Sequence, residues 1–343
     1  MRSLFLYKID KLMTKIAING LGRIGRAVCR ILQERNTTIE LVAVNDLTDN
    51  HTLAHLLKYD SVHGKARFTV DYDENHLIIN EKKIVVTHNP NPEELPWNEL
   101  GIDIVIESTG RYLTKDKASL HLKAGAKRVI LSAPAKSDGI KTVVMGINDA
   151  ILDGTEQIIS NASCTTNSAA PLIKVLDELC GISNAYITTV HSYTMDQRIH
   201  DSVHKDLRRA RAAAENIIPT TTGAAKAITR IFPHLEGHVG GCGIRVPVPD
   251  GSLTDISAVV KNVVSEENIN KAFQLASENE LKGYLQFIDE PIVSRDIIGN
   301  PYSSIFDAGL TSVVGNMVKI VGWYDNEYGY SNRIIDLVEK VSK

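Results

Sequence analysis

The chain has 343 residues, of which 43% are hydrophobic and 23% charged, and its formal net charge is −3. This length suffices for two domains with sizeable cores, and the near balance of charges argues against nucleic acid or an anionic membrane as a partner. The four cysteines, Cys29, Cys164, Cys180 and Cys242, form no Cys-x-x-Cys pair and no group with histidines, so neither a metal site nor a disulfide framework is indicated. A cytoplasmic protein that acts on a small molecule fits these features best.

Residues 1–12, MRSLFLYKIDKL, contain an apolar run that is too short for a secretory signal, and no small-residue cleavage site follows it. No stretch of about 18 apolar residues, the length of a membrane-spanning helix, occurs in the chain. We therefore expect residues 1–12 to be a disordered extension or the product of an upstream start codon, and the fold to begin at Met13.

From Lys15 to about residue 146, short β-branched runs alternate with amphipathic stretches, which predicts βαβ units and a parallel sheet. The run TVVMG at 142–146 is expected to be one of its strands. The segment FTVDYDENHLIINEKKIVV alternates polar and apolar residues about a corner at Asn80–Glu81, which predicts an antiparallel insertion.

After SNASC at 160–164 the pattern changes to a helix followed by long strands, which predicts a second, α+β domain with a mixed sheet. The final segment, SNRIIDLVEKVSK, is amphipathic at helical spacing and should pack back on the first domain. We expect a first domain at 13–163, completed by a C-terminal helix within 326–343, and a catalytic domain at 164–325.

Gly20, Gly22 and Gly25 form a Gly-x-Gly-x-x-Gly motif between the strand KIAIN and a helix. Such glycines let the backbone approach a pyrophosphate at the helix N-terminus. Asp46 follows 21 residues after Gly25, at the end of the next strand, where it can accept both hydroxyls of the adenosine ribose. Because the same carboxylate repels a 2′-phosphate, the motif predicts a Rossmann-type doubly wound domain that binds NAD. Ser108–Gly110 and Ser132–Pro134 also follow strands and are candidate cofactor loops.

Cys164 stands between the strand QIIS and a helix, so its thiol should lie at a helix N-terminus, where the dipole favours a thiolate and a lowered pKa. A thiolate needs an imidazole partner that moves protons near neutral pH. Of the 11 histidines, His191 ends a long strand of the same domain and is the candidate base. The other three cysteines lie in apolar patterns typical of inert core positions.

Two features suggest anion binding. Thr220-Thr221-Thr222-Gly223 precedes the helix AAKAITRIF and offers hydroxyls and a helix N-terminus, although a simple N-cap is the plainer interpretation. Arg245 lies inside the apolar strand GIRVPVP, where a guanidinium needs an anionic partner.

These motifs resemble the phosphorylating glyceraldehyde-3-phosphate dehydrogenases from about Lys15 to Val341, most specifically in INGLGRIGR, SNASCTTN, HKDLRRARAAAENIIPTTTGAAKA and WYDNEYGYSNR. The resemblance implies that Cys164 attacks the aldehyde of glyceraldehyde 3-phosphate while His191 takes a proton, and that inorganic phosphate cleaves the resulting thioester. It also implies a homotetramer in which the segment 194–219 reaches a neighbouring subunit.

By the same resemblance, further residues acquire roles toward the two phosphates and NAD. Those for the substrate phosphate are Thr194 and Arg245; those for the attacking phosphate are Ser163, Thr165, Thr222 and Gly223, assisted by Arg211. Those for the cofactor are Arg23 and Ile24 at the pyrophosphate, Asp46 at the ribose, Ser132 nearby, Asn326 at the carboxamide and Tyr330 beside the nicotinamide.

Three alternatives stay open at this point. Erythrose-4-phosphate dehydrogenase is a relative with the same nucleophile that finishes by hydrolysis, although Tyr193–Thr194 favours the phosphorylating branch. A non-catalytic NAD-binding interaction protein with this fold is a second alternative, although it need not have retained Cys164 and His191. Some use of NADP is a third, because Ser202–Val203 replaces a Leu-Pro pair associated with strict NAD preference.

Overall fold

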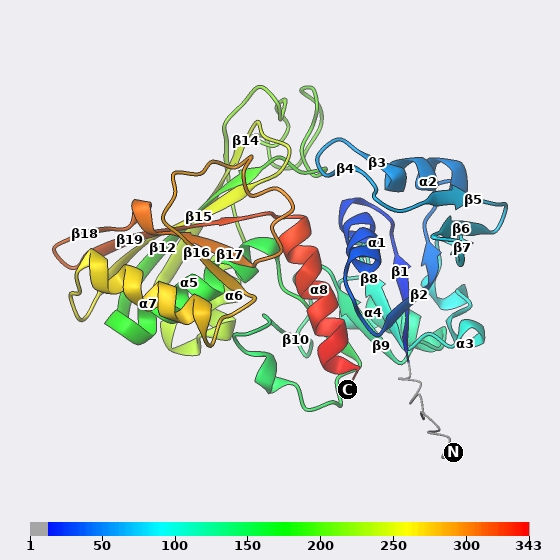
Figure 1. The fold of residues 1–343 in the computed structure, drawn as a ribbon, viewed down its shortest axis with the longest axis horizontal. Helices are drawn as coiled ribbons and strands as arrows, with labels where there is room; N and C mark the ends of the chain where they lie inside the picture. The colour runs from blue at the N-terminus through cyan, green and yellow to red at the C-terminus, as the bar shows by residue number, and fades with distance from the viewer. Residues whose placement is uncertain (1–12, 343) are drawn as a thin grey trace, which may run out of the picture.

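The structure of the chain is a computed structural model that describes residues 13–342, so the expectation for residues 1–12 lies outside the described residues. The chain forms two large sheets that lie side by side, with the C-terminal helix between them (Figure 1). Among residues 13–342, no helix is long and apolar enough to cross a membrane.

The first sheet has nine strands in the order β10-β11-β9-β8-β1-β2-β7-β6-β5. Its centre is parallel, as the alternating pattern predicts. In chain order the strands are β1 (Thr14–Asn19), β2 (Ile39–Asn45), β5 (Val70–Tyr72), β6 (His76–Ile79), β7 (Lys82–Thr87), β8 (Ile104–Glu107), β9 (Arg128–Leu131), β10 (Lys141–Thr142) and β11 (Ile158–Ser160). The helices of this half are α1 (Arg23–Glu34), α2 (Asn50–Lys58), α3 (Trp97–Leu100) and α4 (Lys115–Lys123), and β3 (Tyr59–Asp60) pairs with β4 (Gly64–Lys65) outside the sheet.

The antiparallel insertion is confirmed, because β5 pairs with β6 and β6 with β7 in antiparallel register. Its corner falls at Asn80 and Glu81, whose φ angles of 47° and 68° fit a tight hairpin turn. The prediction of a strand over TVVMG is wrong beyond Thr142, where β10 ends. The Val144 N–H turns to the Asn148 side chain at 2.7 Å, so these buried residues form a turn in place of a longer strand.

The second sheet is mixed, in the order β13-β14-β12-β15-β19-β17-β16, with β18 on β19. The strands are β12 (Ile182–Ser192), β13 (Ile218–Thr220), β14 (Val239–Val246), β15 (Ser252–Val260), β16 (Leu285–Ile288), β17 (Ser304–Asp307), β18 (Ser312–Val314) and β19 (Met317–Tyr324). Helices α5 (Cys164–Cys180), α6 (Ala224–Ile231) and α7 (Glu266–Glu278) pack on it and share its apolar core. The predicted fold class, a Rossmann-type parallel sheet joined to a mixed-sheet α+β unit, is confirmed.

Helix α8 (Tyr328–Val341) returns to the first sheet. Its buried residues Ile334, Ile335, Leu337 and Val338 belong to the same apolar cluster as β1 and α1. Asp325, Asn326 and Glu327, which join β19 to α8, therefore cross from one half of the molecule to the other. Any polar side chain in this crossing lies where the two halves meet.

Gly25 provides the closest approach in the turn between β1 and α1. A Cβ atom on Gly25 would lie 2.2 Å from the carbonyl oxygen of Gly20, which is backbone and cannot move aside. A Cβ on Gly22, by contrast, would meet nothing within 4 Å.

We predict that Gly25→Ala destabilises the protein by about 1–3 kcal/mol, the usual range for a side chain forced into a packed site. Chemical denaturation of the variant and of a Gly22→Ala control measures the difference. Equal stabilities of the two variants would contradict this close packing.

Candidate active site

A cavity of about 750 Å³ opens at the carboxyl ends of β1, β2, β8 and β9 and reaches the second sheet. It brings together most of the residues predicted from the sequence. Those that line it are Gly20, Gly22, Arg23, Ile24, Asp46, Ser132, Ser163, Cys164, His191, Thr194, Arg245, Asn326 and Tyr330. Ser108, Thr109, Ala133 and Pro134 line it too, as the candidate cofactor loops predict.

The end of the cavity over the first sheet fits a dinucleotide. Gly20, at φ 95°, makes the tight turn, and the open space beside Gly22 leaves the backbone at the N-terminus of α1 accessible. Asp46 is oriented by the N–H groups of Leu21 and Thr48, which donate to its two carboxylate oxygens at 2.8 and 2.9 Å. Gly25 does not line the cavity but packs under Gly20.

Arg23 lines the cavity, but its guanidinium is already engaged. It pairs with Asp60 from β3 and with Glu327 from the crossing before α8. Burial alone would raise the pKa of Asp60, yet Arg23 and two backbone N–H groups outweigh burial and lower it to about 2. The charge of Arg23 is therefore used mainly to tie the start of α1 to β3 and to the crossing before α8, and its backbone N–H remains for a cofactor.

The turn that carries Cys164 is strained and held from several sides. Ala162 has a φ of 57°, a conformation that costs a residue with a Cβ about 1–2 kcal/mol. Tyr330 donates to the Ala162 carbonyl at 3.0 Å, and Ser163 caps α5 by accepting from the Thr166 N–H at 3.0 Å. Cys164 is the first residue of α5, so its thiol lies at a helix N-terminus as predicted.

His191 ends β12 and meets Cys164 across the cavity. The distance from Cys164 Sγ to His191 Nε2 is 3.4 Å, and the Nδ1 atom lies 2.7 Å from the carbonyl oxygen of Ser192. In the tautomer with the proton on Nδ1, donated to that carbonyl, Nε2 is free to accept the thiol proton. Arg245 Nη1, which lies 2.5 Å from Nδ1 and bonds the same carbonyl, has to draw back in this tautomer because both nitrogens are donors. This is the arrangement that a cysteine nucleophile and its base require.

The electrostatics of the pair differ from the sequence-based expectation. Burial raises the pKa of the Cys164 thiol, and the opposing effects of Arg245 and Thr165 do not cancel it. Burial also lowers the pKa of His191 to about 3, with the charge of Arg245 acting in the same direction. The prediction of a lowered thiol pKa is therefore wrong for this state of the site, because the helix dipole is outweighed by loss of water. A neutral thiol faces a neutral imidazole, which is the protonation state of a general base before attack.

Arg245 stands where an anion is expected. Its Nη1 atom donates to the Ser192 carbonyl at 2.9 Å and lies 2.5 Å from His191 Nδ1. Among residues 13–342 its side-chain contacts are with the Ser192 carbonyl and His191, and neither is a carboxylate. An unpaired guanidinium beside the nucleophile suits an anionic group of a substrate.

Asn326 is the best-oriented polar residue of the cavity. Its Oδ1 accepts from Ser192 Oγ at 2.9 Å and from Ser252 Oγ at 2.6 Å, and the Asn326 side chain is buried in the crossing between the halves. Two hydroxyl donors on one oxygen fix the amide, so its NH₂ group is left to donate into the cavity.

Four of the predicted phosphate residues do not line the cavity. Thr165 is buried and shares a hydrogen bond with the Tyr324 hydroxyl at 2.9 Å. Thr222 and Gly223 lie at the N-terminus of α6, where the Thr222 hydroxyl accepts from the Ala224 N–H. Arg211 pairs with Asp201 on the surface.

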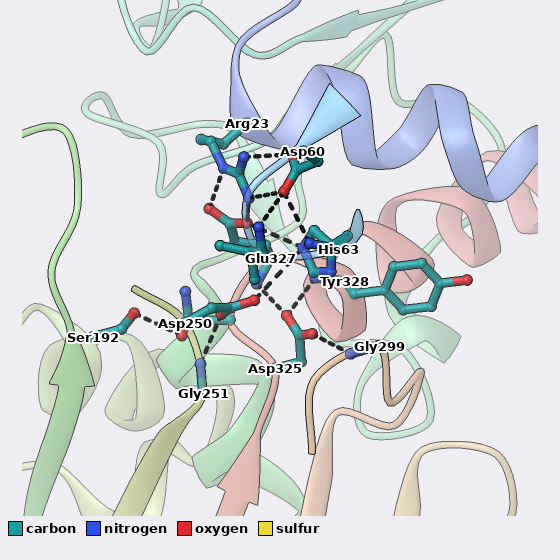
Figure 2. A network of polar contacts seen from close by, with 12 residues as sticks. Arg23, Asp60, His63, Ser192, Asp250, Gly251, Gly299, Asp325, Glu327 and Tyr328 are labelled. Atoms are coloured by element: carbon teal, nitrogen blue, oxygen red, sulfur yellow. Dashed lines mark hydrogen bonds and ion pairs between the residues drawn. The ribbon is translucent and has the colours of Figure 1, made fainter. Parts of the chain in front are cut away.

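Sequence reasoning missed two features of the site. Tyr324 packs edge-on against the His191 ring, and its hydroxyl bridges Thr165 and Thr189. The Tyr-Asp-Asn-Glu run that contains it was visible in the sequence, but nothing there tied the tyrosine to the histidine. His63 was interpreted as a surface or packing residue, whereas Figure 2 shows it among Asp250, Asp325 and Glu327.

The doubly wound sheet, its glycine turn and Asp46 define an NAD-dependent dehydrogenase. Comparison with known proteins identifies the family. The profile "Glyceraldehyde 3-phosphate dehydrogenase, NAD binding domain" matches residues 14–115, and the profile "Glyceraldehyde 3-phosphate dehydrogenase, C-terminal domain" matches residues 163–326. The chain belongs to the glyceraldehyde-3-phosphate dehydrogenase family, which confirms the resemblance inferred from its motifs.

Curated relatives agree over nearly the full length. The chain is 57% identical over 333 residues to glyceraldehyde-3-phosphate dehydrogenase of Thermotoga maritima, covering 96% of this chain and 100% of the relative. It is 54% identical to the proteins of that name from Mycobacterium avium and Geobacillus stearothermophilus, covering 96% of this chain and 98% of each relative.

We predict that His191 makes the protein less stable as the pH falls from neutral. The folded state keeps His191 neutral down to about pH 3, whereas the unfolded chain takes up the proton near its ordinary pKa. Protons therefore favour the unfolded state below about pH 6.5, by roughly 2 kcal/mol at pH 5.

Urea denaturation of the wild type and His191→Gln at pH 7 and pH 5 measures this effect. The wild type should lose more stability between the two pH values than the variant does. An equal loss in both proteins would contradict a neutral His191 in the fold.

Proposed function

We propose that this chain catalyses the NAD-dependent oxidation of D-glyceraldehyde 3-phosphate, with uptake of inorganic phosphate, to 1,3-bisphosphoglycerate. The observation that carries the proposal is the contact of Cys164 Sγ with His191 Nε2 at 3.4 Å, inside the cavity that also holds the glycine turn and Asp46. A thiol with its base beside a dinucleotide site suits an aldehyde that is oxidised as a thioester.

In the first step Cys164 Sγ bonds to the aldehyde carbon while its proton passes to His191 Nε2 and from there to the carbonyl oxygen, which gives a thiohemiacetal and leaves His191 neutral again. Bound NAD would supply the acceptor for the hydride that leaves this carbon. His191 takes the hydroxyl proton as the carbonyl of the thioester forms. An oxygen of inorganic phosphate then bonds to the thioester carbon, the carbon–sulfur bond breaks, and Cys164 leaves with the electron pair.

The two phosphates are assigned by the resemblance of the motifs to those of the family. Arg245 and Thr194, both lining the cavity, would hold the phosphate of the substrate. The attacking phosphate would be held by Ser163 with Thr165, Thr222 and Gly223 as further members. Since Thr165 is bonded to Tyr324 and Arg211 is paired with Asp201, a shift of these side chains on binding is part of the proposal.

The chain uses NAD as its cofactor, and its contacts are assigned from the fit of the cavity. The N-terminus of α1, with Arg23 and Ile24, would face the pyrophosphate, Asp46 the ribose, and Ser132 a neighbouring position. The free NH₂ group of Asn326 would donate to the carboxamide of the nicotinamide, beside Tyr330. Asp46 supports NAD over NADP because its carboxylate repels a 2′-phosphate.

The nearest alternative is the oxidation of erythrose 4-phosphate with hydrolysis of the thioester. The contact of Cys164 with His191 serves both reactions, so only the substrate and the use of phosphate separate them. A non-catalytic NAD-binding role is the second alternative, and the formed contact between thiol and imidazole argues against it.

We also propose a cytoplasmic homotetramer, divided into an NAD-binding domain at 13–163 with the helix of 326–343 and a catalytic domain at 164–325. The segment 194–219 supports this assembly, because its apolar residues Val203, Ile199 and Met195 are 92%, 83% and 82% exposed to solvent. Apolar side chains so exposed on one segment are typical of an interface.

We predict that light scattering gives a mass four times that of the chain. Val203→Asp should lower the measured mass, because it places a charge in the interface. A monomeric wild type would contradict the proposal.

We predict rapid reduction of NAD when the protein meets glyceraldehyde 3-phosphate and inorganic phosphate. Omitting phosphate should stop steady turnover, and Cys164→Ser should lower kcat on the order of a thousandfold or more. Absorbance of the reduced cofactor measures both effects, and Cys242→Ser, outside the cavity, is the matched control. Turnover that ignores phosphate, or that is faster with erythrose 4-phosphate, would favour the hydrolytic alternative.

A further inference from the structure

A group of ionisable side chains extends inward from the wall of the cavity, where the two halves of the molecule meet (Figure 2). It draws on four parts of the chain: the start of α1, the β3–β4 turn, the loop before β15, and the crossing before α8. Its members are Arg23, Asp60, His63, Asp250, Asp325 and Glu327. The four carboxylates face the guanidinium of Arg23, and the charges of Arg26 and Arg30 act on Asp60 from further along α1. Negative charge is still in excess around Asp250 and Asp325, and an excess in a buried place needs compensation.

Asp250 is the member that lacks a partner. Its side chain is fully buried, and its Oδ1 accepts from the Gly251 N–H at 2.8 Å. Its Oδ2, as a carboxylate oxygen, has no hydrogen-bond donor among residues 13–342. His63 Nε2 lies 3.6 Å away and is closer, at 3.2 Å, to Glu327.

Asp325 is in the opposite situation, because it is fully supplied with donors as an anion. Its Oδ1 accepts from the N–H groups of Glu327 and Tyr328 at 2.9 and 2.6 Å, and its Oδ2 accepts from the Gly299 N–H at 2.7 Å. The acceptor atoms of Asp250, Asp325 and His63 all lie within 4.8 Å of one another. Within residues 13–342, Asp325 Oδ2 accepts from one backbone donor only, so this oxygen can accept one further proton donor.

We infer that Asp250 carries a proton, that its Oδ2–H donates to Asp325, and that this acid pair is a positioning device for Asn326. Protonation turns the one unpartnered oxygen into a donor and removes a buried negative charge. In agreement, burial and the nearby charges of Asp325 and Glu327 raise the pKa of Asp250 to about 10. Two carboxyl groups that share a proton in a site closed to water are a known way to relieve such crowding.

The link to Asn326 follows from the strand register. β15 and β19 pair up to Ser252 and Tyr324, and the next residues at this end are Asp250 and Gly251 on one side and Asp325 and Asn326 on the other. The Ser252 hydroxyl fixes Asn326, while the acid pair fixes the turn on which Asn326 stands. The inference rests on the proposed function in one respect, the contact of Asn326 with the nicotinamide carboxamide.

A bound cation is the other way to balance the charge, but the surroundings favour the proton. Arg23 already places a positive charge on Glu327, and both oxygens of Asp325 are occupied by backbone donors. A cation needs several free oxygens around it, which these contacts do not leave, whereas a proton needs only Asp250 Oδ2 and one lone pair of Asp325.

The test compares Asp250→Asn with Asp250→Ala in the full-length protein. Asparagine has the shape of a protonated aspartate and can donate to Asp325, whereas alanine cannot. We expect Asp250→Ala to weaken NAD binding about tenfold, the effect of losing one buried hydrogen bond, and Asp250→Asn to weaken it less than threefold. Calorimetry measures both affinities, and Asp71→Asn, on the exposed strand β5, is the matched control.

Infrared difference spectroscopy gives a readout that a merely structural role would not move. The wild type minus Asp250→Asn should show the carbonyl stretch of a protonated carboxyl group at neutral pH. Absence of that band, equal damage by Asn and Ala, or a stoichiometric metal ion in the purified protein would each overturn the inference. The band reports the proton whatever the substrate is, whereas NAD binding by Asn326→Ala tests the proposed role of Asn326, so the two failures are distinguishable.

Discussion

The contact between the Cys164 thiol and the His191 imidazole requires α5 to begin at the point where β12 ends. His191 is carried there by β12, whose position is fixed by pairing with β14 on one side and β15 on the other. Cys164 is carried there by α5, which is rooted in the apolar core of the same sheet. The strained Ala162 and its bond to Tyr330 then tie this point to α8, and so to the dinucleotide end of the cavity.

Water exclusion shapes the chemistry of this contact. It keeps thiol and imidazole neutral in the free site, so the ionic character of the nucleophile develops as the substrate arrives, with Arg245 as the nearest positive charge. The same exclusion operates at the wall of the cavity, where Arg23 pairs with Asp60 and with Glu327 in the crossing before α8. Partly buried ion pairs of this kind fix the orientation of the elements that they join more than they add stability.

The sequence predicted the fold well because its signals are local. The glycine motif, the alternation of strands and helices and the Asn80–Glu81 corner each have a physical cause within a few residues. The prediction failed at TVVMG, because nothing in this apolar run indicated that the Val144 N–H would donate to the Asn148 side chain and not to a neighbouring strand. It also failed on the thiol pKa, since a helix dipole can be read from sequence but burial cannot. The roles of Tyr324, His63 and Asp250 were invisible because each depends on contacts between segments far apart in the chain.

The central claim is that Cys164, activated by His191, holds the oxidised substrate as a thioester. It is tested most directly by mixing the enzyme with glyceraldehyde 3-phosphate and NAD in the absence of phosphate and measuring the mass of the protein and of its peptides. The account predicts one acyl group, on the peptide of Cys164, that disappears when phosphate is added. An acyl group on another residue, or reduction of NAD with Cys164 left unmodified throughout, would contradict it.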